Sequence, residues 1–165
     1  MSSRRALARE TPAPPKAWEG SLDARRLRLG IVCARWNPTV TDALLHSALG
    51  AVERHHVRPS RLTIVRVPGA FELPAAARAL IRCRRCDALA VLAAIIRGET
   101  SHHEVLAHAV AGALSALSAE TGTPIGFGVL TCDTLEQARK RIEKGAEAVE
   151  AAIELANLRR ALSRK

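Results

Sequence analysis

A run of nine apolar residues, from Ala88 to Ile96, constrains the fold of this chain more than any other stretch. A strand with one wet face alternates apolar and polar residues, whereas an uninterrupted run is typical of a strand covered on both faces. The run ends in Arg97-Gly98, and a long segment with apolar residues at helical spacing follows. These features predict a buried strand, a tight turn and a helix, as in parallel sheets with right-handed crossovers.

The same alternation of strand and helix continues along the chain. Asn37-Pro38 resembles a helix N-cap followed by proline at the first helical position. The order predicts an α/β fold over residues 27–162: a single-domain three-layer α/β/α sandwich, flavodoxin-like, with a four-stranded parallel sheet. We expect strands over 27–34, 62–67, 88–96 and 125–131, and helices over 38–55, 71–82, 101–121, 133–142 and 146–162.

The net charge of +9 raises nucleic acid as a partner, but the charge is concentrated at the two ends. Residues 1–26 carry a net charge of +3 and residues 159–165 a net charge of +4. Aromatic residues, which stack on bases, make up only 2% of the chain. We therefore expect no nucleic-acid partner and predict that residues 1–26, which are rich in proline and arginine, form a flexible basic N-terminal arm. RNA binding by the basic ends is the alternative.

The cysteines and the N-terminal sequence bear on metal binding and location. Cys83-Arg-Arg-Cys86 has the spacing of a metal or redox pair, but no second close Cys/His pair completes a zinc site. Cys33 and Cys132 fall in apolar strand segments, where cysteine acts as a small hydrophobic residue. We expect no metal ion. No apolar stretch has the length of a signal peptide or a membrane span, so we expect a cytoplasmic location.

Unusual residues follow the predicted strands, whose carboxyl ends share the edge of the sheet where ligands bind. Gly98 can take backbone angles closed to other residues. Thr100 or Ser101 can cap the next helix, whose free N–H groups form an anion site. His102 lies one turn away and can transfer protons near neutral pH. The stretch predicts a phosphate-binding active site; the alternative is a surface histidine on a capped helix.

Three further side chains near these ends have both a functional and a structural interpretation. Trp36 directly follows a strand, where its ring could stack on a planar ligand or pack as an ordinary aromatic. Glu72 could bind a ligand or could simply be favourably placed at a helix N-terminus. Arg141 could bind an anion or lie on a solvated face. No glycine-rich nucleotide-binding fingerprint is present.

Four segments, in order and at suitable spacing, together resemble the lumazine synthase family over residues 27–158. They are 34–37 (Ala-Arg-Trp-Asn), 67–74 (Val-Pro-Gly-Ala-Phe-Glu-Leu-Pro), 96–102 (Ile-Arg-Gly-Glu-Thr-Ser-His), and 127–131 (Phe-Gly-Val-Leu-Thr) with 136–138 (Glu-Gln-Ala). The resemblance implies a 6,7-dimethyl-8-ribityllumazine synthase. Such a transferase of riboflavin biosynthesis condenses 5-amino-6-(D-ribitylamino)uracil with 3,4-dihydroxy-2-butanone 4-phosphate and releases phosphate and water. It needs no cofactor.

The resemblance also implies residue roles. His102 is the expected catalytic residue, which transfers protons. Trp36 would stack on the pyrimidine, and the neighbouring subunit would supply Phe127 and Arg141. The expected substrate-binding residues are Trp36, Ala70, Phe71, Glu72, Ala94, Ile95, Ile96 and Phe127. The expected phosphate-binding residues are Glu99, Thr100, Arg141 and Lys144.

Two departures from the family pattern matter. His103 stands where the family usually has an aromatic residue, and neighbours on a helix point about 100° apart, so only one histidine should face the site. The motif spacing favours His102. The link over 141–145 is several residues shorter than usual, which affects Lys144 and the higher assembly.

The expected partners are small-molecule substrates and further copies of the chain, with no membrane. The helix over 101–121 has more apolar surface than one sheet face can cover, which supports a homopentamer at least. A decamer and a shell of about 60 subunits are larger alternatives, and we expect pentamers or small multiples to dominate over shells. Two other functions stay open: a related riboflavin synthase that dismutates two lumazine molecules, and a flavin- or lumazine-binding shell protein without turnover. The intact motifs at 71–74 and 98–102 favour the condensing enzyme.

Overall fold

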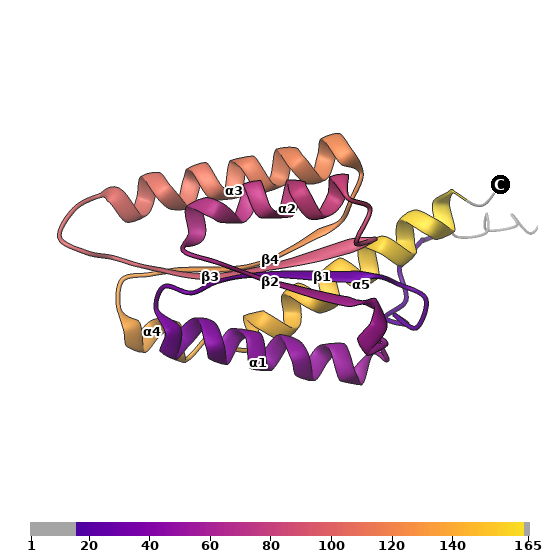
Figure 1. Ribbon diagram of the computed structural model, residues 1–165, viewed down its shortest axis with the longest axis horizontal. Coiled ribbons are helices and arrows are strands. Elements are labelled where there is room, and N and C mark those ends of the chain that lie inside the picture. Colours follow the sequence, from indigo (N-terminus) through magenta and orange to yellow (C-terminus); the bar gives the residue numbers. More distant parts are fainter. Residues whose placement is uncertain (1–15, 164–165) are drawn as a thin grey trace, which may run out of the picture.

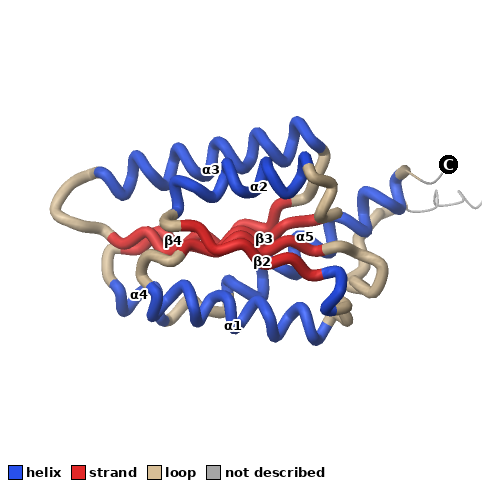
Figure 2. The backbone as a smooth tube through the Cα atoms, viewed as in Figure 1, coloured by secondary structure: helices blue, strands red, loops and turns tan. Residues whose placement is uncertain are grey.

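The computed structural model describes residues 16–163. They form one four-stranded, fully parallel sheet in the order β2-β1-β3-β4, with helices on both faces (Figures 1 and 2). This confirms the predicted three-layer α/β/α sandwich. The strands are β1 (Leu29–Ala34), β2 (Leu62–Val67), β3 (Ala88–Ile96) and β4 (Ile125–Cys132).

The helices are divided between the two faces of the sheet. Figure 1 shows α2 (Leu73–Arg82) and α3 (His102–Thr121) on one face and α1 (Pro38–Arg54), α4 (Leu135–Arg139) and α5 (Lys144–Leu162) on the other. Short 3₁₀ turns, η1 (Pro59–Arg61) and η2 (Ala70–Glu72), precede β2 and α2. The helix expected over 133–142 is shorter, as α4, and a turn separates it from α5. Within residues 16–163 no helix is both long and apolar enough to cross a bilayer.

The central strand β3 is buried on both faces, as its uninterrupted apolar run predicts. Ala88, Ala90, Leu92 and Ala94 pack with α1 and α5, and Leu89, Val91, Ala93 and Ile95 pack with α2 and α3. Burying a leucine-sized side chain contributes roughly 1.5–3 kcal/mol. Burial on both faces of β3 therefore helps to hold both layers of helices to the sheet.

Helix α5 packs against its neighbours at two glycines. A Cβ on Gly126 of β4 would lie 1.7 Å from the carbonyl oxygen of Ala148, and a Cβ on Gly145 would lie 2.0 Å from that of Leu44 in α1. Neither position can hold a larger residue without moving a backbone. Glu150 of α5 also accepts hydrogen bonds from α1 and the residue after it, which ties the two helices together.

Residues 21–26, which the sequence placed in a flexible arm, contact the domain in the structure, and residues 1–15 lie outside the described part. Ala24 is fully buried, and its N–H donates to the carbonyl of His55 at 3.1 Å. The side-chain amide of Asn157 in α5 donates to the carbonyls of Ser21, at 2.7 Å, and Asp23, at 2.9 Å. Composition suggested an arm, but these long-range contacts hold the segment against the domain.

Candidate active site

A groove lies where the strands end, beside the first turn of α3; we call it the strand-end groove. It consists of two adjoining cavities, of about 430 and 180 Å³, which share Trp36, Ala70, His102 and Leu106 as lining residues. The groove brings together most of the residues that the sequence singled out. Those that line it are Trp36, Ala70, Phe71, Glu72, Ala94, Ile95, Ile96, Thr100 and His102.

The indole of Trp36 is 73% exposed at one wall of this groove. The pairing of β1 with β2 continues past the strand ends, because the N–H of Arg35 donates to the carbonyl of Val67 at 2.8 Å and that of Trp36 to Pro68 at 3.1 Å. Two backbone bonds thus fix the base of a side chain whose ring is open to solvent. Such a ring is available to a flat ligand.

Asn37 has a role that the sequence reasoning missed. Asn37 occupies the N-cap position of α1 with Pro38 after it, as predicted, but it adopts the left-handed conformation, with φ 58°, and its side chain makes no capping bond to α1. Instead, its amide donates to the carbonyl oxygen of Ala94 at 2.8 Å. Pairing of β1 with β3 ends at Cys33 and Leu92, so this side chain bonds β3 beyond the last backbone contact. The available signal was that asparagine tolerates left-handed angles.

The turn between β2 and α2 lines the larger cavity beside Trp36. Glu72 is half-buried, and one carboxylate oxygen accepts the N–H of Gly69 at 2.8 Å. Phe71 is 70% exposed, whereas Ala70 is buried at the base of the turn. The turn therefore presents one carboxylate and backbone groups to the groove, as suits a polyhydroxylated ligand.

The two adjacent histidines are in different environments. His102 is exposed and lines both cavities of the groove. His103 is 9% exposed, and its Nδ1 lies 3.1 Å from the carbonyl oxygen of Thr100, to which the protonated nitrogen donates. His103 thus holds the loop before α3 and lines only the smaller cavity, whereas His102 is the more exposed imidazole and lines both.

The loop before α3 differs in detail from the expectation. Gly98 does not adopt a positive φ and a Cβ there would meet open space, so the expected need for glycine geometry is wrong. Ser101 makes no side-chain cap, whereas the hydroxyl of Thr100 accepts the N–H of His102 at 3.4 Å. The N–H groups of Glu104 and Val105 donate to the Ser101 carbonyl, whereas those of Ser101 and His103 have no partner among residues 16–163 and stay available to an anion, which the helix dipole also favours.

Four predicted residues do not line the groove of a single chain. Glu99 is exposed in the loop before α3, and Phe127 is 48% exposed on β4, against a separate cavity beside α3. The Arg141 guanidinium donates to the carbonyl of Gln137 at 2.8 Å, on the turn after α4. Lys144 pairs with Glu147 within α5.

The cysteines show no sign of an activated pair. Burial raises the pKa values of the Cys33 and Cys86 thiols to about 11, so both are protonated at neutral pH. Cys83 is exposed and Cys86 is buried, and the two are not bonded to each other. Among residues 16–163 no three His, Cys, Asp or Glu side chains are grouped so that they could hold a metal ion.

Comparison with known proteins agrees with the motifs. Residues 26–160 match the family model described as 6,7-dimethyl-8-ribityllumazine synthase. A protein named 6,7-dimethyl-8-ribityllumazine synthase from Anaeromyxobacter sp. (strain Fw109-5) is 44% identical over 148 residues, which cover 87% of this chain and 91% of the relative. The strand-end groove, the motifs around it and these matches identify the chain as a member of the 6,7-dimethyl-8-ribityllumazine synthase family.

Proposed function

We propose that the strand-end groove is where this chain carries out the reaction of its family. As a member, the chain is a transferase of riboflavin biosynthesis that condenses 5-amino-6-(D-ribitylamino)uracil with 3,4-dihydroxy-2-butanone 4-phosphate. The observation that carries the proposal is the pairing of the open Trp36 ring with the free His102 imidazole in one groove. A ring platform and a proton carrier are what a planar amine substrate requires.

The substrates fit the walls of the groove in a definite order. The pyrimidine stacks on Trp36, and its polar edge meets the backbone of Ala94, Ile95 and Ile96 at the end of β3. The ribityl chain follows the turn that carries Ala70, Phe71 and Glu72. The phosphate of the second substrate lies at the N-terminus of α3, near Glu99 and Thr100, where free N–H groups favour an anion.

The reaction needs repeated proton transfer beside this phosphate site. The amine attacks the ketone, and loss of water gives an imine. Phosphate is then eliminated, and the ring closes with loss of a second water. His102 accepts and returns the protons, which contributes roughly 10²- to 10⁴-fold. The N–H groups of α3 stabilise the leaving phosphate.

A neighbouring copy completes the groove in this proposal. Phe127 and Arg141 lie outside the groove of their own chain, and β4 is an edge strand on which Phe127 is exposed. Val110, Leu114 and Leu117 of α3 are buried, whereas Val105 is 66% exposed. Ala109, Gly112, Ala113 and Ala116 add a small-residue surface on the exposed side of α3. A ring of copies, at least a homopentamer, would cover this surface.

The test compares His102→Ala with His103→Ala in the lumazine-forming assay. His102→Ala should slow turnover strongly and leave substrate binding and thermal unfolding nearly unchanged. His103→Ala should lower the melting temperature, because its buried ring supports the loop, and should slow turnover less. A larger loss of turnover at His103 in a stably folded variant would contradict the assignment. Product formed from lumazine alone, without the butanone phosphate, would instead indicate the riboflavin synthase alternative.

The shared site is tested by mixing two impaired variants. Arg141→Ala should weaken phosphate binding, because a guanidinium matches phosphate oxygens by forked hydrogen bonds. Arg139→Ala, an exposed arginine on α4, is its matched control. When His102→Ala and Arg141→Ala chains are unfolded and refolded together, about a quarter of the sites in a ring regain both residues. No recovery of activity, or a monomer in sedimentation, would refute a site shared between copies.

A further inference from the structure

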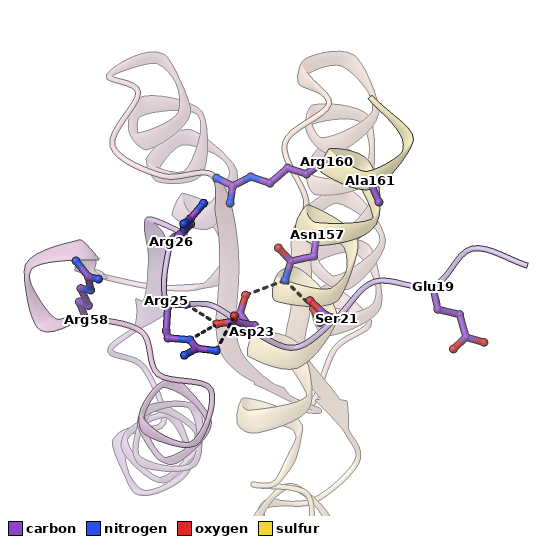
Figure 3. Close-up of a pocket in the computed structure, with 9 residues that line it drawn as sticks. All are labelled: Glu19, Ser21, Asp23, Arg25, Arg26, Arg58, Asn157, Arg160 and Ala161. Atoms are coloured by element: carbon purple, nitrogen blue, oxygen red, sulfur yellow. Dashed lines mark hydrogen bonds and ion pairs between the residues drawn. The ribbon is translucent and has the colours of Figure 1, made fainter. Parts of the chain in front are cut away.

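A second cavity, of about 720 Å³, lies at the opposite end of the sheet from the strand-end groove. Residues 19–26, Arg58 before β2 and the last turns of α5 form its walls, and we call it the arginine cavity (Figure 3). It contains no residue of the proposed reaction. Its volume lies within the range of small-molecule sites, roughly 300–1,000 Å³.

The charged groups around the arginine cavity are unbalanced. Arg25 uses its side chain on Asp23, with hydrogen bonds of 3.0 and 3.1 Å that lower the pKa of that carboxyl. The side chains of Arg26 and Arg58 make no hydrogen bond or ion pair with any residue among 16–163. In Figure 3, Arg160 extends from α5 toward Arg26. Two unpaired guanidinium groups thus face the cavity.

The two other charged residues near the cavity do not cancel this excess. The guanidinium of Arg160 lies 3.4 Å from a carboxylate oxygen of Asp87. That carboxylate already pairs with Arg28, at 2.7 Å, so Arg160 is only partly neutralised. Glu19 is exposed, and Figure 3 shows it pointing away from the other labelled side chains. In the sequence, residues 1–16 are themselves basic, with four Lys/Arg and one Glu.

The walls are firmly built rather than formed by loose side chains. A Cβ on Gly20 would lie 1.8 Å from the carbonyl oxygen of Glu154, so the segment passes directly over the α5 backbone. The two hydrogen bonds from Asn157 and the buried Ala24 hold the same segment. The arginines are therefore carried on a docked segment and a helix, which limits the entropy lost on binding.

We propose that the arginine cavity binds a small ligand through two or more linked phosphate groups. Guanidinium forks match phosphate oxygens, and two unpaired forks with a third nearby suit more than one phosphate. Among residues 16–163 no aromatic residue lines the cavity, so this part of the chain offers no platform for a base, and recognition rests on the phosphates. Free pyrophosphate or triphosphate and a nucleoside diphosphate share this chemistry.

The test measures binding of inorganic tripolyphosphate by calorimetry at moderate salt. The cavity variant is Arg26→Gln/Arg58→Gln, and Arg82→Gln/Arg85→Gln removes equal charge from exposed positions elsewhere as the control. The cavity variant should bind tripolyphosphate at least about tenfold more weakly, at unchanged rates of lumazine formation. The control should bind like the unmodified chain. Equal weakening in both variants, or no weakening in the cavity variant, overturns the proposal.

Further arms identify the source of the phosphates. ADP that binds as well as pyrophosphate and loses its affinity in the cavity variant supports a nucleotide or similar conjugate. Pyrophosphate that binds while ADP does not supports the free ion. An RNA oligonucleotide that outcompetes tripolyphosphate overturns the proposal, because the arginines would then belong to an extended nucleic-acid surface.

Discussion

Replacement of Asn37 tests whether one side chain holds the strand-end groove together. Its amide donates to the carbonyl of Ala94 at 2.8 Å, and Ala94 is only 6% exposed. Leaving a buried carbonyl unpaired costs about 1–3 kcal/mol. Asn37→Gly should therefore destabilise the fold by about 1–2 kcal/mol, because glycine accepts the left-handed φ without strain.

Asn37→Asp is the sharper variant, because it keeps the size of the side chain and the tolerance of left-handed angles. A carboxylate cannot donate, and it places an oxygen against the Ala94 carbonyl. We expect a loss of about 2–3 kcal/mol near pH 7, or a melting temperature lower by roughly 4–12 °C. Once protonated, the carboxyl can donate again, so the loss relative to the unmodified chain should shrink near pH 4.

The assay is urea unfolding at matched protein concentration, since assembly adds to apparent stability. A kinetic readout accompanies it, because Asn37 adjoins Trp36 and the end of β3. KM for the ribitylaminouracil should rise in both variants. If Asn37→Asp is as stable as the unmodified chain near pH 7, or if its loss is independent of pH, the bond to Ala94 does not have this role.

Two other predictions concern acid stability and ligand binding. Burial of Asp87 opposes ionisation, but hydrogen bonds from the side chain and N–H of Arg28 outweigh this effect, and the pKa lies below its usual value. The stabilisation that the ionised Asp87 carboxylate gives the fold is therefore complete above about pH 4 and is lost as pH falls through the folded pKa. Asp87→Asn should have a lower free energy of unfolding than the unmodified chain near pH 7, and the two values should converge in stronger acid. Urea unfolding at a series of pH values measures this, and an equal difference at every pH would contradict the prediction. Riboflavin or lumazine should quench the fluorescence of Trp36 but not that of Trp18. Quenching that persists in Trp36→Leu would show that the ligand binds elsewhere.

The fold could be predicted because its signals are local. The apolar run of β3 and the alternation of strands with helices follow from neighbouring residues, and the strand ends then had to meet at one edge. For the same reason, the motif residues of the groove could be named in advance. His102 lines the groove, as the motif spacing predicts, and the structure adds that His103 is nearly buried at the smaller cavity and bonded to the loop before α3.

The features that escaped prediction depend on contacts between distant residues. Asn37 is the N-cap residue of α1, as predicted, but its side chain bonds Ala94, which lies 57 positions away in the chain. The basic composition of residues 21–26 suggested an arm, and Asn157, 136 positions from Ser21, holds it in place. The contributions of Phe127 and Arg141 stay predictions, because they require a second copy of the chain.

The packing of α5 has a consequence for how the chain is made. The partners of α5 come from the first third of the sequence. Gly20 lies against the α5 backbone, and Glu150 accepts a hydrogen bond from Arg54, 96 positions earlier. The α1 layer, with its buried Leu44, thus cannot be closed until the final helix has left the ribosome. Nascent chains must expose this apolar face for nearly the whole of synthesis, and late closure of such distant contacts slows folding. Protection of the unfinished α1 layer from aggregation is therefore a requirement for producing this protein.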